Sequence, residues 1–383
     1  MKTFIKYLFF GLIALIALFQ KVYSEEKIKI GLIIPLSGEY REIGESILKS
    51  VRLAINKIND ENLIIIPKDT KSNPEITLKV SKELYKEGVK IILGPVFNNS
   101  SLYLDELKEV TFLSFTNKIN NNPVNVISAG VNAISQINTI KKFQKLNGLE
   151  RSIFLIPNSN YKEEIESAIK KTKINLKDTF IYNTDPTVLT SQIEELTRYK
   201  QRKRNVEDEI IRLENSNDIN KKNKIAKLKK RDTLGGINFD SIIIADFDEG
   251  LKSVATSFLY TDISSKRITY ICFNQWFDES LLKEKSLQPI YFPSINKKNY
   301  EIFSEDYYQS YNSYPNQISF LSYDLIGFVY YLIYKNNFKI NKKIFIKKNK
   351  FKGKIGIFEI SKNIITHQLN FYSVESEEFK KIF

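Results

Sequence analysis

The sequence has 383 residues, of which 42% are hydrophobic and 13% aromatic, and this composition indicates a globular protein and excludes a disordered chain. Lys and Arg outnumber Asp and Glu by 58 to 44, but the lysines are dispersed rather than clustered with aromatic residues, which argues against nucleic-acid binding. The single cysteine, Cys272, and the single histidine, His367, exclude an internal disulfide and a transition-metal site built on Cys and His. We therefore expect neither a metal nor a cofactor.

The first 24 residues differ in kind from the rest. Lys2 and Lys6 precede an apolar run at 7–19, and residues 22–24 resemble a signal-peptidase site. The run is about 13 residues long, whereas a membrane span needs about 20, so a cleaved secretory signal is favoured over an uncleaved anchor. We expect an exported mature protein that starts near Glu25.

A strand, a polar turn and a helix open the mature chain. Apolar residues at 28–34 predict a buried strand of a parallel sheet, and apolar positions from Ile43 to Ile58 recur at the spacing of an amphipathic helix. The turn between them lies at the carboxyl end of the strand, where open parallel sheets bind ligands. Ser37 and Gly38 are therefore candidates to hold a small polar molecule.

The alternation of strands and helices continues to about residue 130. Strands are predicted at 63–67, 89–93, 111–115 and 124–127, with a helix at 74–87. Asn98, Asn99 and Ser100 follow one strand and Thr116 follows another. Two interpretations stay open for Asn98, Asn99 and Ser100, because the same residue types cap helices and bind carboxylates.

A second lobe is predicted after Gly130. Its strands are expected at 152–156, 179–182, 239–245 and 267–273, with helices at 133–145, 162–172 and 251–260. Tyr161 and Trp276 follow strands and either stack on a ligand or pack between the lobes, with packing the better interpretation of Trp276. Of Asp246, Asp248 and Glu249, two are favoured as caps of the next helix, although one of the three could meet a ligand ammonium.

The rest of the chain completes two discontinuous lobes. A charged stretch at 190–232 with a thin apolar stripe predicts a helical hairpin that projects from the second lobe. Helices are predicted at 299–311 and 317–335, and alternating strands at 351–360 and 364–372. Since the two late helices have no strand of their own, we expect residues 25–131 with 274–337 in one lobe and 132–273 with 338–383 in the other.

Several segments in this order resemble the type I periplasmic binding proteins, in the branch of the leucine/isoleucine/valine-binding proteins. They are IGLIIPLSGEYREIGESILKSVRLAINKIND, ILGPVFNNSS, LSFTN, PNSNY and FKGKIGIFEISKNIITHQLNFYSV. LSFTNK, RDTLGGINFDSIIIADFDEG and FNQWFDESLLKE are similar to the penicillin-binding protein activators within that family. The resemblance implies an α/β fold of two doubly wound lobes and a periplasmic location.

The resemblance also implies a site. Asn98 and Thr116 match positions that hold a ligand carboxylate, Tyr161 matches an aromatic wall, and Asp246 is the acid that would face the ligand ammonium. Serine is usual where Asn98 stands. The lipoprotein cysteine of the enterobacterial activator is missing.

Two functions are left open. No phosphate-binding loop, nucleophile elbow or metalloprotease signature occurs, so we expect a binding protein and not an enzyme. The first function is a solute-binding protein that closes on a small amino-acid-like ligand and delivers it to a membrane ABC permease. The second is a regulator of peptidoglycan synthesis that contacts a cell-wall synthase through protein surfaces, with the hairpin as one such surface.

Overall fold

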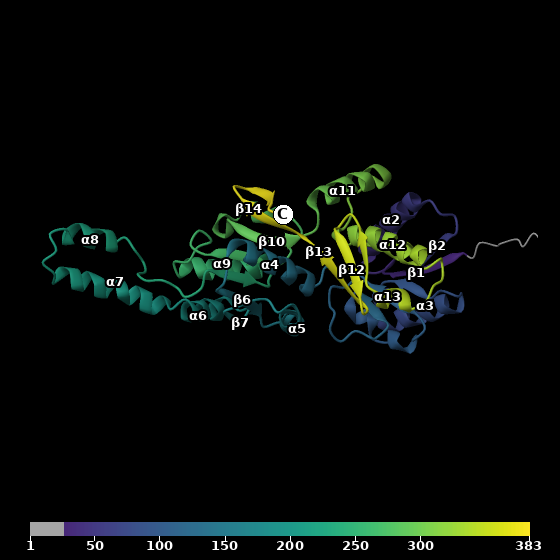
Figure 1. Cartoon of the computed structure of the whole chain (residues 1–383), viewed down its shortest axis with the longest axis horizontal. Coiled ribbons are helices and arrows are strands. Elements are labelled where there is room, and N and C mark those ends of the chain that lie inside the picture. The colour runs from purple at the N-terminus through teal and green to yellow at the C-terminus, as the bar shows by residue number, and fades with distance from the viewer. Residues whose placement is uncertain (1–26) are drawn as a thin grey trace, which may run out of the picture.

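A computed structural model describes residues 27–383 and shows two α/β lobes side by side (Figure 1). The predicted signal segment lies outside the described residues. Within the described part of the chain, no helix is both long and apolar enough to cross a membrane.

The first lobe is built on sheet A, whose strands are all parallel. They run in the order β2 (Leu63–Asp69), β1 (Ile28–Ile34), β3 (Ile91–Leu93), β4 (Thr111–Ser114) and β5 (Val126–Ser128). β1 pairs on both sides and every residue of it except Lys29 is buried. This burial on two faces explains the near-continuous run of Ile and Leu in β1.

Helices cover both faces of sheet A. They are α2 (Arg41–Ile58), α3 (Pro74–Lys86), α11 (Lys297–Tyr311) and α12 (Gln317–Lys335), with the short helices η1 (Asn98–Ser101), η2 (Leu104–Glu106) and α13 (Lys343–Ile346). α12 packs along α2, where Ser50 donates a hydrogen bond to the carbonyl of Ser319 (2.5 Å). Because α12 is apolar on most of its surface, it is buried between α2 and the C-terminal strands.

The second lobe is built on sheet B. Its order is β15 (Glu378–Lys381), β14 (Asn370–Glu375), β10 (Ile290–Ser294), β9 (Thr269–Cys272), β8 (Ser241–Ile244), β6 (Ser152–Pro157) and β7 (Asp178–Tyr182), and all pairs are parallel except the two that β14 forms with β15 and β10. Its helices are α4 (Ala133–Asn147), α5 (Lys162–Thr172), α6 (Pro186–Leu196), α9 (Asp248–Tyr260), α10 (Ser280–Lys283) and η3 (Lys285–Leu287).

The chain passes between the lobes at three places, and two of these differ from the prediction. Residues 274–337 were expected in the first lobe, but β10 pairs with β9 and β14 in sheet B, so the chain returns to the first lobe only after Ser294. No strand was predicted here because Pro289 and Pro293 interrupt the apolar run.

The C-terminal segment also divides between the lobes. Residues 338–383 were expected in the second lobe, but β11 (Asn349–Lys352), β12 (Ile357–Ser361) and β13 (Ile364–Gln368) form a separate antiparallel sheet C. Phe358 and Ile365 of this sheet belong to the same core as Phe328 of α12. Only β14 and β15 join sheet B. The alternating pattern of these strands predicts one buried face, but it does not specify which lobe covers that face.

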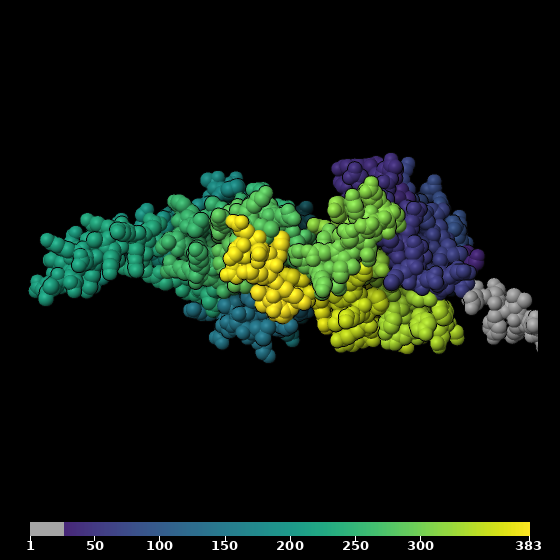
Figure 2. Space-filling view, turned by 90° about the horizontal axis from the view of Figure 1, so that it is seen from above, coloured from purple at the N-terminus to yellow at the C-terminus, as the bar shows by residue number. Residues whose placement is uncertain are grey.

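A projecting arm leaves the second lobe, and we call residues 198–232 the basic arm. It contains α7 (Tyr199–Glu214) and α8 (Lys221–Leu228), which lie against each other at the far end of the molecule (Figures 1 and 2). The predicted hairpin began at residue 190, but Leu189 and Ile193 of α6 lie in the core of the lobe. Arg198 has a left-handed backbone (φ 53°) that separates α6 from α7, so the arm starts there.

Candidate functional site

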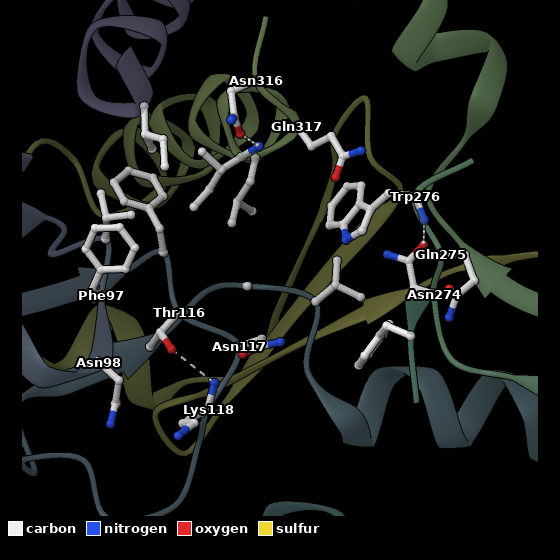
Figure 3. A pocket seen from close by; sticks show the side chains of 18 of the residues that line it. Phe97, Asn98, Thr116, Asn117, Lys118, Asn274, Gln275, Trp276, Asn316 and Gln317 are labelled. Atoms are coloured by element: carbon white, nitrogen blue, oxygen red, sulfur yellow. Dashed lines mark hydrogen bonds between the residues drawn. The ribbon is translucent and has the colours of Figure 1, made fainter. Parts of the chain in front are cut away.

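A cleft of about 850 Å³ lies between the two lobes, where the carboxyl ends of strands from both sheets meet (Figure 3). Its lining residues follow β3 and β4 in the first lobe and β6, β8 and β9 in the second, and the start of α12 adds a third wall. This is the position at which parallel sheets bind ligands, and the volume is within the range of small-molecule sites, about 300–1,000 Å³.

The first-lobe wall carries Asn98, Asn99, Thr116, Asn117 and Lys118. The side-chain oxygen of Asn98 is buried and has no hydrogen-bond partner among the described residues. The Thr116 hydroxyl accepts a hydrogen bond from the Lys118 N–H (3.2 Å), which keeps its proton free for a ligand. Buried polar atoms are nearly always paired, so the Asn98 oxygen marks a place where a ligand or water donor is expected.

The segment between β5 and α4, where the chain first crosses between the lobes, supports this wall. The Gly130 N–H donates to the Thr116 carbonyl (3.0 Å), and a Cβ on Gly130 would lie 2.7 Å from that oxygen. Only glycine allows the two backbones to approach this closely.

The second-lobe wall is held by its own hydrogen bonds. The Asn274 side-chain oxygen accepts from the Trp276 N–H (2.9 Å) and the Ser294 hydroxyl (2.7 Å), and the Asn274 N–H donates to the Gln136 side chain (2.7 Å). The Gln275 amide donates to the Asp246 carbonyl (3.1 Å). These bonds fix Trp276 at the cleft, where Gln317 from the start of α12 lies beside it (Figure 3).

The predicted site residues divide into two groups. Asn98, Asn99, Thr116 and Tyr161 line the cleft together. The other four do not line it: they are Ser37, Gly38, Ser100 and Asp246.

Neighbouring side chains and burial explain why three of these residues, Ser37, Ser100 and Asp246, lie apart from the cleft. The Ser37 hydroxyl donates to the Asp69 carboxylate (2.5 Å) at the end of β2, and Ser100 is only 1% exposed. The Asp246 carboxylate accepts from the Tyr182 hydroxyl (2.5 Å), and burial together with this bond raises the pKa of Tyr182. Two other acids line the cleft, Asp248 two residues later and Asp278 after β9.

Sequence reasoning missed several lining residues. Lys118 directly follows the Thr116 turn, Gln136 lies in the first turn of α4 just after the crossing, and Asn316 caps α12 by accepting from the Ile318 N–H (3.1 Å). Each lies next to a turn or helix start that the sequence did reveal. The position of Lys118 next to Thr116 could have identified Lys118 as a lining residue. Gln317 also lines the cleft, but its place at the start of a predicted helix did not indicate that this helix reaches the cleft.

A polar contact joins the lobes beside the cleft. The Glu164 carboxylate at the start of α5 accepts from the backbone N–H groups of Ile119 (2.9 Å) and Asn120 (3.0 Å), which belong to the loop after β4. The Ser167 hydroxyl donates to the Asn120 side chain (3.2 Å). We call this contact the lobe latch. It couples a first-lobe loop that lines the cleft to a second-lobe helix.

The chemistry of the cleft is that of recognition. Four of its carboxamide side chains, those of Asn98, Asn99, Asn117 and Gln317, form no side-chain hydrogen bond with other described residues and can both donate and accept. Among residues 27–383 no group of three or more His, Cys, Asp and Glu is placed to hold a metal ion. Aromatic rings of Tyr161 and Trp276 supply apolar surface for a bound molecule.

Comparisons with known proteins bear on the family and the fold of the chain. Residues 27–186 match the family model described as periplasmic binding protein. No protein with a curated function matches the chain by sequence. The predicted resemblance to periplasmic binding proteins is thereby supported for residues 27–186.

Solved structures share the fold over nearly the whole chain. A putative branched-chain amino acid ABC transporter protein from Rhodospirillum rubrum is 12% identical with a TM-score of 0.71, and 93% of this chain and 100% of that chain are covered. The C-domain of LpoA from Haemophilus influenzae, a regulator of PBP1A, is 13% identical with a TM-score of 0.63 and coverage of 93% and 100%.

A third structure holds a bound ligand. It is a solute-binding protein of an ABC transporter from Rhodopseudomonas palustris BisB5, in complex with 3,4-dihydroxybenzoic acid, with 16% identity, a TM-score of 0.55 and coverage of 91% and 93%. At these identities the similarity establishes the fold. The chain is thus a two-lobed protein with the type I periplasmic binding fold, and its residues 27–186 carry the sequence pattern of the periplasmic binding protein family.

Proposed function

We propose that this protein is an exported solute-binding protein that holds a small, amino-acid-like ligand in the cleft between its lobes and delivers it to a membrane ABC permease. The observation that carries the proposal is the unpaired, buried oxygen of Asn98, which lines the cleft together with Thr116 and with the aromatic side chains of Tyr161 and Trp276. A cleft that combines convergent polar groups with aromatic rings is typical of ligand binding.

The charges at the cleft match a zwitterion or a carboxylate. Lys118 and the Thr116 hydroxyl are donors on the first-lobe side, and the exposed carboxylate of Asp248 lies on the second-lobe side. In this arrangement the ligand carboxylate binds near Thr116 and its ammonium near Asp248. Asp248 thus takes the role that the sequence assigned to Asp246, whose carboxylate is engaged by Tyr182.

Calorimetry against amino acids tests the proposal. Asn98→Ala and Thr116→Ala should each weaken binding by about 1–3 kcal/mol, because the ligand loses the amide group of Asn98, whose oxygen can accept from it, and the hydroxyl donor of Thr116 in a desolvated cleft. Ser37→Ala is the matched control, since Ser37 also follows a strand but does not line the cleft. Unchanged affinity in both cleft variants, or a loss in the control as large as theirs, would refute the assignment.

A second candidate is a regulator that acts on a cell-wall synthase through protein contacts. The observation that favours it is the basic arm, a long projecting surface that the cleft does not require. The LpoA C-domain, a regulator of PBP1A, has the same fold. If no amino acid or short peptide binds while a purified synthase does, this second function replaces the first.

A further inference from the structure

The basic arm concentrates the charge of the protein. Residues 198–232 contain 13 Lys and Arg against six Asp and Glu, a net charge of +7, while the whole chain has +14. Within the arm, residues 221–231 hold seven Lys and Arg and no acid. About half of the net charge therefore lies in a projecting element of 35 residues, which a uniform lysine-rich composition does not explain.

Most of the charges on the α8 side have no internal partner. Lys221 donates to the carbonyls of Glu214 (3.0 Å) and Ser216 (3.1 Å), and Lys224 pairs with Asp218, so these two lysines close the turn of the arm. The remaining five have no ion pair with any residue of the described chain: they are Lys222, Lys227, Lys229, Lys230 and Arg231. Their charge is available to an external anionic surface.

The tip of the arm is apolar as well as basic. Ile219, in the turn between α7 and α8, is 99% exposed, and Ile211 near the end of α7 is 56% exposed. An exposed isoleucine at the apex of a projecting element contributes nothing to the fold. It is available for insertion into an apolar environment.

The root of the arm is rigid. Arg202 is 2% exposed, and its guanidinium donates to the Thr233 hydroxyl (2.6 Å) and the Thr261 carbonyl (3.1 Å). The Tyr199 hydroxyl donates to Asp232 (2.7 Å). Because α7 has 16 residues, the arm holds its tip about 24 Å from this root.

We propose that the basic arm docks the protein on an anionic phospholipid surface, with the lysines of residues 222–230 at the headgroups and Ile219 inserted at the boundary of the acyl chains. Basic residues that flank an apolar side chain are typical of interfacial membrane contacts. A protein partner would need a larger apolar patch than two separated isoleucines, so a lipid surface matches the arm better. Such docking would keep a ligand-loaded protein close to a membrane, and it does not depend on which ligand fills the cleft.

Vesicle binding of the purified protein tests the proposal. The probes are vesicles with 30% phosphatidylglycerol in phosphatidylcholine and vesicles of phosphatidylcholine alone. Each Lys near an anionic surface contributes about fivefold to binding, so the triple variant Lys222→Gln, Lys229→Gln, Lys230→Gln should bind the anionic vesicles about a hundredfold more weakly. The wild-type protein should not bind the neutral vesicles, and its binding should weaken with salt.

A matched control separates the arm from net charge. Lys57, Lys79 and Lys86 are exposed lysines of α2 and α3 on the other lobe, and changing these three to Gln alters the net charge equally. This control should bind the anionic vesicles as the wild type does. Equal losses in the two triple variants, or no binding of the wild type at low salt, would overturn the proposal.

The apolar tip is tested by fluorescence. Trp276 is the single tryptophan, so a protein with Trp276→Phe and Ile219→Trp carries one indole at the tip of the arm. Its emission should shift to shorter wavelength on anionic vesicles and stay unchanged on neutral ones. Binding without a shift would rule out insertion of the tip, and binding of the arm to a purified acidic protein but not to vesicles would replace the lipid by a protein partner.

Discussion

Replacing Glu164 with glutamine should move the protein toward a more open arrangement of its lobes. In the lobe latch the two oxygens of Glu164 each accept a backbone N–H, from Ile119 at 2.9 Å and Asn120 at 3.0 Å. Glutamine keeps one acceptor oxygen and presents an NH₂ group to the other N–H, so one charge-assisted hydrogen bond is lost. Such a bond contributes about 1.5–3 kcal/mol, and the lower end applies because Glu164 is only half-buried.

A loss of about 1.5 kcal/mol changes the ratio of the two arrangements about tenfold. If the ligand binds the arrangement seen here, its apparent Kd should rise by at most the same factor. Spin labels at Lys57→Cys on α2 and Lys170→Cys on α5 report the distance between lobes by pulsed electron resonance. The native Cys272 is fully buried, and burial raises the pKa of its thiol, so it should not react with the label.

Glu163→Gln is the control for this experiment. Glu163 is the preceding residue in the first turn of α5, so both variants lose the same charge at the same helix N-terminus. The Glu163 carboxylate takes no part in the lobe latch, and only its backbone carbonyl meets Asn120. Identical distance distributions in Glu164→Gln and Glu163→Gln would refute the idea that the latch holds the lobes.

Three further predictions concern stability. Gly130→Ala should destabilise the protein by about 1–3 kcal/mol, because its Cβ would lie 2.7 Å from the Thr116 carbonyl oxygen. Gly236→Ala should not destabilise the protein, because no atom lies within 4 Å of its new Cβ. Urea denaturation compares the two variants. Burial raises the pKa of Asp324 to about 6, so the folded state holds the proton more tightly than the unfolded chain. The free energy of unfolding should therefore rise by up to about 3 kcal/mol as the pH falls from 6 to 4. Urea denaturation at each pH should show that Asp324→Asn lacks this rise. Burial lowers the pKa of His367 to about 4, so its contribution has the opposite sign: stability should fall as the pH drops from 6.5 to 4, and His367→Gln should remove that fall in the same melts.

Half of the predicted site could be located from the sequence because strand ends are local features. Asn98 and Thr116 each follow a short, wholly buried strand, and parallel strands place their carboxyl ends at one edge of a sheet. Ser37 follows a strand in the same way but lies away from the cleft, because its hydroxyl donates a hydrogen bond to Asp69 at the end of the adjacent strand. The pairing of two strand ends 32 residues apart is not visible in either local pattern.

The arrangement of the late segments depended on tertiary contacts in the same way. The periodicity at 317–335 predicted a buried helix, and α12 is that helix, but nothing local indicates that β10 pairs with β9 and β14 or that sheet C covers α12. β10 was not predicted because Pro289 lies next to it and Pro293 within it, and proline weakens a strand prediction wherever it occurs.

By itself the sequence determined the alternation of strands and helices, the polar turns at the strand ends and the charged stretch that projects as the basic arm. These features follow from the spacing of apolar residues and from turn chemistry, which act over a few residues. Tertiary structure alone decided where the chain crosses between lobes, which acids line the cleft and that Glu164 joins two lobes through backbone N–H groups. Backbone N–H groups are the same in every residue except proline, so a contact to them leaves no trace in the sequence of the partner loop.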